Sequence, residues 1–312
     1  MTTASMTMSP AMPEKKPSAI READVDQAAA NDTVVAVQAE GAPVVAAGRS
    51  NKLRDALGAI VHAVLPPLIG LALLVGIWTL VAMHTTGFPS PLKTWHAAVV
   101  IFSDPFYING PNDQGIGWNI LSSLKRVVIG FGYAAAVGIP MGFAIGRFKF
   151  LRSMVDPIIS LLRPVSPLAW LPIGLLVFHR ADPAATWTIF ICSIWPMIIN
   201  TAVGVQRVPQ DYMNVARVLN LSEMKIFTKI LFPAVLPYML TGIRLSIGTA
   251  WLVIVAAEML TGGVGIGFWV WDEWNNLKVE HIVIAIFVIG IVGLLLEMLL
   301  LQIAKRFSYE HS

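Results

Sequence analysis

Residues 207–233 read RVPQDYMNVARVLNLSEMKIFTKILFP, a charged segment between two long apolar ones. Pro209 suits the first position of a helix, and Asp211 favours the positively charged amino-terminal end of that helix. Asn220 can adopt the left-handed conformation that ends a helix, and Ser222 can cap a second one. The segment therefore predicts two short amphipathic helices joined by a turn at the surface of a membrane protein.

Each expected helix carries an apolar stripe at helical spacing. In the first helix the stripe consists of Tyr212, Val215 or Ala216, and Leu219. In the second it consists of Ile226, Phe227, Ile230 and Leu231. Pro233 and Pro237 are then expected to break the chain before the next apolar span. Such a helix pair indicates a docking site for a partner, and the alternative is an ordinary loop that packs on its own bundle.

The composition is that of an all-α integral membrane protein. The chain has 312 residues, of which 56% are hydrophobic and 13% are charged, whereas soluble domains carry about 25% charged residues. Because about 20 apolar residues cross a bilayer, six transmembrane helices are expected. They lie near residues 63–83, 127–146, 155–178, 184–206, 236–260 and 282–303. The third is interrupted by Arg163 and four prolines, which predicts a broken helix.

The distribution of positive charge predicts the topology. Lysine and arginine collect in the amino-terminal segment, after the second span, in residues 207–233 and after the sixth span. By the positive-inside rule both termini are cytoplasmic. Residues 1–55 are expected to be a disordered cytoplasmic tail, and residues 56–312 the transmembrane domain. This orientation accounts for the net charge of +3, which therefore does not indicate nucleic-acid binding.

Several classes of chemistry are excluded by missing motifs. The sequence contains no Gly-Lys pair and therefore no phosphate-binding loop, so it is not itself a P-loop ATPase. It also lacks His-Glu-x-x-His and Cys-x-x-Cys, and its single cysteine, Cys192, lies in an apolar run. The chain is therefore expected not to be an enzyme and to hold no metal or cofactor.

Polar residues at membrane depth are candidates for a transport path. Arg163 lies near the expected midplane, where it could attract an anion, and Ser166, Asn200 and Thr201 are nearby candidates for hydrogen bonding. The alternative is a structural pairing of Arg163 with a backbone carbonyl or with an acidic residue such as Glu258.

Charged residues near the ends of the spans have two interpretations each. Lys125 and Arg126, before the second span, could form an outer anion funnel or anchor the helix at the lipid headgroups. Glu258 is expected to be a solvated carboxylate at the outer end of the fifth span, with a gating pair as the alternative. Arg244 is expected to extend its side chain toward the cytoplasmic interface.

Residues 207–233 resemble the cytoplasmic signature loop of ABC-importer permeases, whose pattern is Glu-Ala-Ala, three residues, Gly, nine residues and Ile-x-Leu-Pro. Ala216, Ile230 and Pro233 match at the correct spacing. The remaining signature positions carry substitutions, at Asn214, Val215, Asn220 and Phe232. The resemblance extends over roughly residues 55–308. Residues 162–172, 199–201, 236–245 and 256–260 resemble the nitrate, sulfonate, taurine and bicarbonate branch, and residues 265–277 look closest to nitrate/nitrite and bicarbonate permeases.

The resemblance implies a type I importer permease with six helices in the bacterial inner (plasma) membrane. It implies four kinds of neighbour: a second permease copy, two cytoplasmic ATPase subunits that bind ATP and Mg, a periplasmic substrate-binding protein, and the lipid bilayer. The residues expected to couple the permease to the ATPases are Tyr212, Asn214, Val215, Ala216, Arg217, Leu219, Asn220 and Pro233.

The expected function is import of a small inorganic anion, most directly nitrate or nitrite, with bicarbonate and alkyl sulfonates such as taurine as alternatives. A competing class is a self-sufficient anion channel or ion-coupled carrier. A channel needs no docking helix, and a carrier usually shows internal repeats and paired intramembrane charges. A purely structural membrane anchor is a third interpretation, which Arg163 and the broken third span disfavour.

Overall fold

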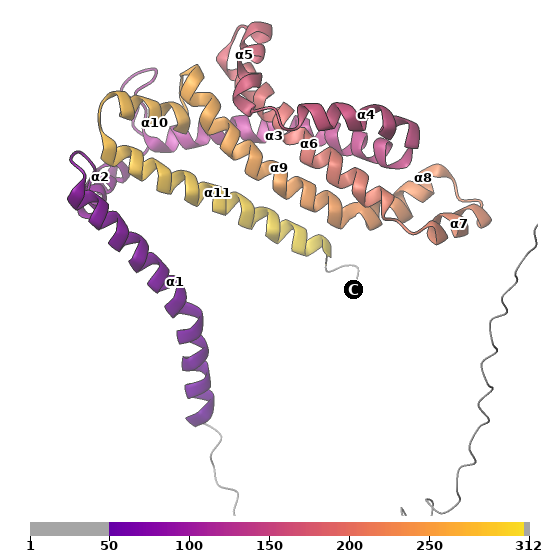
Figure 1. Cartoon of the computed structure of the whole chain (residues 1–312), viewed down its shortest axis with the longest axis horizontal. Helices are drawn as coiled ribbons and strands as arrows, with labels where there is room; N and C mark the ends of the chain where they lie inside the picture. Colours follow the sequence, from indigo (N-terminus) through magenta and orange to yellow (C-terminus); the bar gives the residue numbers. More distant parts are fainter. Residues whose placement is uncertain (1–49, 309–312) are drawn as a thin grey trace, which may run out of the picture. The chain divides into compact units, whose positions relative to one another are not determined.

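The computed structural model describes residues 50–308, so most of the segment 1–55 lies outside the described residues. Apart from one isolated bridge between Ile108 and Gln114, the regular structure of the described part is helical. The elements are α1 (Ser50–His84), α2 (Pro91–Ser103), α3 (Ile116–Arg147), α4 (Lys149–Leu162), α5 (Pro167–Phe178), α6 (Ala181–Gln206), α7 (Gln210–Val218), α8 (Glu223–Ile226), the π-helix η2 (Phe227–Leu231), α9 (Phe232–Thr261), α10 (Ile266–Asn275) and α11 (Val279–Ser308) (Figure 1).

Within these residues, five helical stretches are long and apolar enough to cross a membrane. They are 64–84, 116–147, 181–206, 223–261 and 279–306. The helices α4 and α5 form a sixth candidate, bent by 101° at the break between them. The predicted all-helical membrane architecture is confirmed, and so is the break in its third span. The helix α1 begins at Ser50, inside the segment that was expected to be tail.

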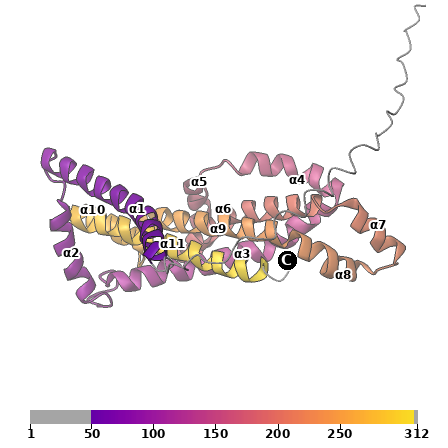
Figure 2. The same ribbon diagram turned by 90° about the horizontal axis from the view of Figure 1, so that it is seen from below.

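The centre of the unit formed by residues 70–312 is the packing of α3 against α6 and of α6 against α9 (Figures 1 and 2). Glycines of α3 allow the close approach to α6. A Cβ at Gly142 would lie 2.6 Å from the Cβ of Thr201, and one at Gly130 would lie 2.8 Å from that of Ile189. Small residues at such contacts let helix backbones approach closely. Helices in a lipid bilayer associate largely through the van der Waals contacts that this close approach allows.

The expected break at Pro233 and Pro237 is wrong. Residues 223–261 form one continuous helical stretch, and both prolines lie inside it. The π-helix η2 precedes Pro233, and the amide of Phe232 bonds to the carbonyl of Phe227, five residues earlier. Proline lacks an amide and crowds the carbonyl four residues before it. A wider turn relieves that conflict, so the helix continues.

Gly142→Ala is expected to lower the melting temperature of the purified protein in detergent. The added methyl group would meet Thr201, and such overpacking costs about 1–3 kcal/mol. Gly132→Ala on the same helix is the matched control, because nothing lies within 4 Å of that position and alanine is the better helix former. Equal melting temperatures for the two variants would contradict the close approach of α3 to α6.

Candidate functional site

The helix α7 ends in a left-handed turn at Asn220, whose φ is 47°. The amide of Leu221 bonds to the carbonyl of Ala216 at 3.0 Å, and that of Asn220 to Arg217 at 3.0 Å. This pair of bonds is the Schellman motif. The predicted stop at Asn220 is confirmed, and the motif directs the chain back toward α8.

One face of α7 packs on the protein through Met213 and Ala216, and Ala216 is fully buried. They belong to an apolar cluster with Val208, Ile226 and Leu231. The predicted stripe of the second helix is therefore buried at Ile226 and Leu231. Phe227 contacts Phe143 of α3, with ring centroids 5.0 Å apart. These contacts attach residues 207–233 to the transmembrane core.

The other face of α7 presents apolar side chains outward. Its residues Tyr212, Val215 and Val218, with Leu219 just after α7 and Met224 of α8, form what we call the docking surface, and all five are between 56% and 82% exposed. The predicted first stripe thus forms, but apart from Ala216 it faces away from the protein. Arg217 donates a hydrogen bond to Asn214 at 3.3 Å beside this surface. Exposed apolar surface of this kind is typical of a contact with another protein or with the membrane.

At the far end of α9 from α7, a buried ion pair joins α3 to α9. Arg126 donates to Glu258 at 2.7 Å and to the carbonyl of Val264 at 2.8 Å. Glu258 is 1% exposed and also accepts hydrogen bonds from Ser123 at 2.7 Å and from the amide of Gly267 at 3.0 Å. These partners compensate the cost of burying the carboxylate. The expectation of a solvated Glu258, or of a pair with Arg163, is wrong.

The same network fixes the loop between α9 and α10. The amide of Gly265 donates to Asn119 at 2.9 Å, and that of Ile266 to Ser123 at 2.9 Å. Arg126 also pairs with Asp182 of α6, so two carboxylates neutralise its charge. Lys125 is exposed.

Sequence reasoning missed Asn119 and Ser123. Their spacing with Arg126 (i, i+4, i+7) places all three on one helix face. This spacing was the only pattern in the sequence that could have linked them to Arg126.

The four candidate pathway residues do not converge. Arg163 and Ser166 are exposed at the bend between α4 and α5. Thr201 is buried against Gly142 of α3, and its hydroxyl has no hydrogen-bond partner among the described residues. Asn200 donates to the carbonyl of Pro196 at 2.8 Å. Only Arg163 and Ser166 are therefore placed together.

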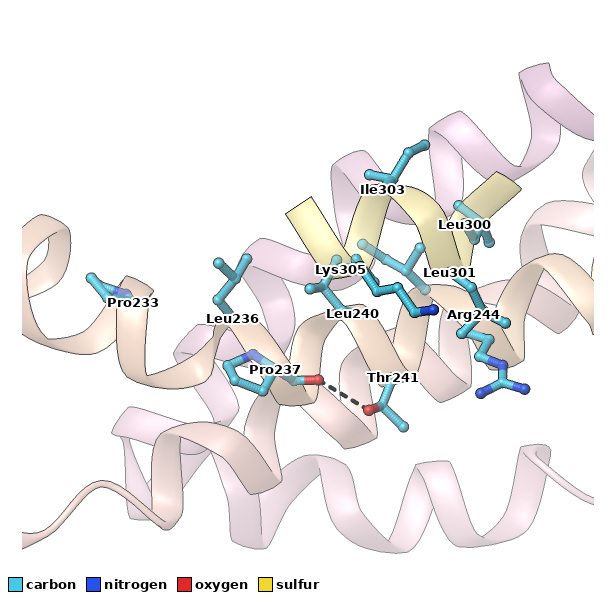
Figure 3. A pocket seen from close by; sticks show the side chains of 12 residues that line it. Pro233, Leu236, Pro237, Leu240, Thr241, Arg244, Leu300, Leu301, Ile303 and Lys305 are labelled. Carbon is cyan, nitrogen blue, oxygen red and sulfur yellow. Dashed lines mark hydrogen bonds between the residues drawn. The ribbon is translucent and has the colours of Figure 1, made fainter. Parts of the chain in front are cut away.

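A cavity of about 550 Å³ lies between the beginning of α9 and the end of α11 (Figure 3). Its lining is mainly leucine, isoleucine and proline, and Thr241 donates within it to the carbonyl of Pro237 at 3.0 Å. At one side Arg244 donates to Glu297 of α11 at 2.9 Å. Arg244 therefore joins α9 to α11, a pairing that the sequence did not predict, and its side chain stays about half exposed.

Comparison with known proteins identifies the family. Residues 134–309 match the model for the binding-protein-dependent transport system inner membrane component. The chain belongs to this family. It is a multi-pass inner-membrane permease subunit and not an enzyme, and the predicted membership of the ABC-importer permeases is confirmed.

Several relatives of the permease cover most of its length. It is 48% identical to the nitrate import permease protein NrtB of Synechocystis sp., over 75% of this chain and 86% of that protein. It is 47% identical to NrtB of Leptolyngbya laminosa, over 82% and 92%. The bicarbonate transport system permease protein CmpB of Synechocystis sp. is 44% identical, over 75% and 85%.

A solved structure shows the same fold. The permease superposes on a chain of the inward-facing MetNI methionine ABC transporter with a TM-score of 0.52 at 15% identity. The match covers 61% of this chain and 94% of that one. The permease fold is therefore that of an ABC importer.

Glu258→Ala is expected to destabilise the permease by about 3–5 kcal/mol, because it removes the buried carboxylate beside Arg126 and leaves the buried donors of Ser123 and Gly267 without their acceptor. Asp182→Ala is the control. It removes a carboxylate from the same arginine, but its side chain is 65% exposed, and exposed pairs contribute about 0–1 kcal/mol. Thermal unfolding in detergent measures both. Equal losses of stability in the two variants would show that burial does not determine how much Glu258 contributes to stability.

Proposed function

We propose that this chain is the membrane-spanning permease of an ATP-driven importer that carries a small inorganic anion, nitrate or nitrite, into the cytoplasm. The docking surface on α7 carries the proposal. A chain without a phosphate loop that presents Tyr212, Val215 and Leu219 outward needs a partner to supply energy. The similarity to nitrate import permeases at 48% and 47% identity supports the choice of anion.

The proposed partners follow from the same surface. Two cytoplasmic ATPase subunits bind ATP and Mg, and each receives one α7. A second copy of the permease and a periplasmic substrate-binding protein complete the complex. Movement of α7 reaches the core through Ala216, which is buried, and through Phe227 against Phe143. Rigid, closely packed contacts of this kind transmit displacement.

For the anion path we propose Arg163 and Ser166, which the bend between α4 and α5 leaves exposed. Non-helical backbone at membrane depth is tolerated where it lines a cavity or is buried in protein. Asn200 and Thr201 contribute to the path only if α6 turns during transport. At the outer end, Lys125 is the better candidate for attracting anions, because Glu258 and Asp182 neutralise Arg126.

Bicarbonate is the second candidate substrate, because the bicarbonate permease of Synechocystis sp. is 44% identical over a similar length. A self-sufficient channel or carrier is less well supported, since neither needs an exposed apolar helix face at the end of the bundle. The permease with its ATPase and binding protein is therefore the system in which to test the function.

The double variant Tyr212→Ser, Leu219→Ser is expected to lose at least about tenfold in affinity for the ATPase subunits, because truncating the few residues that anchor an interface costs about 2 kcal/mol or more each. Co-purification and ATP-dependent uptake measure the loss. Leu277→Ser is the control, because Leu277 is 81% exposed but follows α10. If the double variant binds ATPase as the control does, the docking surface is not the coupling site.

Substrate choice can be tested by competition in proteoliposomes that contain the complete complex. With labelled nitrate as substrate, a hundredfold excess of unlabelled nitrate or nitrite is expected to abolish uptake, whereas bicarbonate at the same excess leaves it largely intact. Direct uptake of labelled bicarbonate is the reciprocal experiment. ATP-dependent bicarbonate uptake without nitrate uptake would replace the first candidate by the second.

A further inference from the structure

Two cavities lie side by side along α4 and α6, and both are lined by Arg152 and Gln206. The first, of about 250 Å³, is next to α7, and its polar lining also includes Arg147, Lys149 and Gln210. The second, of about 290 Å³, continues toward the bend, and its polar lining also includes Asp156, Ser160 and Arg163. We call the two together the basic groove.

Positive charge predominates along the basic groove. It has four cations, at Arg147, Lys149, Arg152 and Arg163. Two carboxylates lie near them: Asp156 is 3.4 Å from Arg152, and Glu223 is 3.7 Å from Arg147. Within the described residues, no carboxylate lies within 4.0 Å of Lys149 or Arg163. Two of the four charges therefore remain uncompensated by the protein.

The groove has room for a small anion. Arg163 follows Arg152 by eleven residues, which corresponds to about 16 Å of helical rise, roughly half of the hydrocarbon thickness. Each cavity holds several molecules of water size, since water occupies about 30 Å³ in the liquid. A small oxyanion with part of its hydration shell fits, and amide groups of Gln206 and Gln210 can donate hydrogen bonds to it.

We propose that the basic groove is the exit by which the anion leaves the permease toward the ATPase side. Arg152, which lines both cavities, receives the anion from Arg163 and passes it toward Lys149. The inference rests on the proposed function for the identity of the anion, but the preference of the groove for anions follows from its charges alone.

The groove also connects release of the anion with docking. Gln210 and Met213 of α7, and Leu231 of the π-helix, line the cavity next to α7. Met213 lies on the buried face of α7, opposite the docking surface. A displacement of α7 by the ATPase therefore changes the shape of this cavity, so that the exit opens or closes with the nucleotide cycle.

The charge of the groove can be measured without transport. Cys192 is the only cysteine and is buried, so Cys192→Ser with Ser160→Cys places one thiol in the groove. An anionic methanethiosulfonate is expected to label it at least about threefold faster than a cationic one of similar size, because cations attract the former and repel the latter. Adding Arg152→Gln and Arg163→Gln is expected to remove this preference.

The matched control is Lys305→Gln with Arg306→Gln, which removes the same charge from the end of α11. It is expected to leave the labelling preference unchanged. The proposal is overturned if the thiol at position 160 shows no preference for the anionic reagent, or if the control removes the preference as fully as the groove variants do.

Transport separates this inference from the proposed function. In the reconstituted complex, Arg152→Gln is expected to lower anion uptake at least about fivefold while ATPase binding stays intact, and Arg152→Lys to retain most of the uptake. If the Arg152→Gln variant takes up the anion at the wild-type rate, the basic groove is not the exit. If the wild-type complex imports no anion while the labelling preference holds, the proposed function fails and the anion-selective groove stands.

Discussion

The close approach of α3 to α6 is the contact on which the rest of the structure depends. In a lipid bilayer the hydrophobic effect does not drive helices together, so their association depends on van der Waals packing between small residues. Gly130 and Gly142 bring the two backbones together. Every functional feature described above is attached to this pair of helices or to α9 beside it.

The two ends of the core are stabilised by different interactions. At the end with α10, the buried pair of Arg126 and Glu258 ties α3 to α9 and fixes the intervening loop through backbone amides. At the end with α7, aromatic and aliphatic contacts around Phe143 attach the docking surface. The charged network depends on directional hydrogen bonds of specific geometry, whereas the α7 end is held by the packing of apolar side chains.

The helix α7 contributes to both the basic groove and the docking surface. Met213 of α7 lines the groove, and Leu219 belongs to the exposed surface. An importer needs its exit to respond to nucleotide binding in a separate subunit. Under the proposed function, α7 would provide that link without a longer chain of contacts.

The sequence by itself determined the membrane class, the apolar spans, the break near Arg163 and the turn at Asn220, because these depend on local composition and backbone preference. Only the tertiary structure decided that Arg126 pairs with Glu258, that Arg244 pairs with Glu297 and that the helix continues through Pro233. The reason is that an ion pair joins residues more than fifty positions apart, and a π-helix depends on how the turn packs; neither leaves a local pattern in the chain.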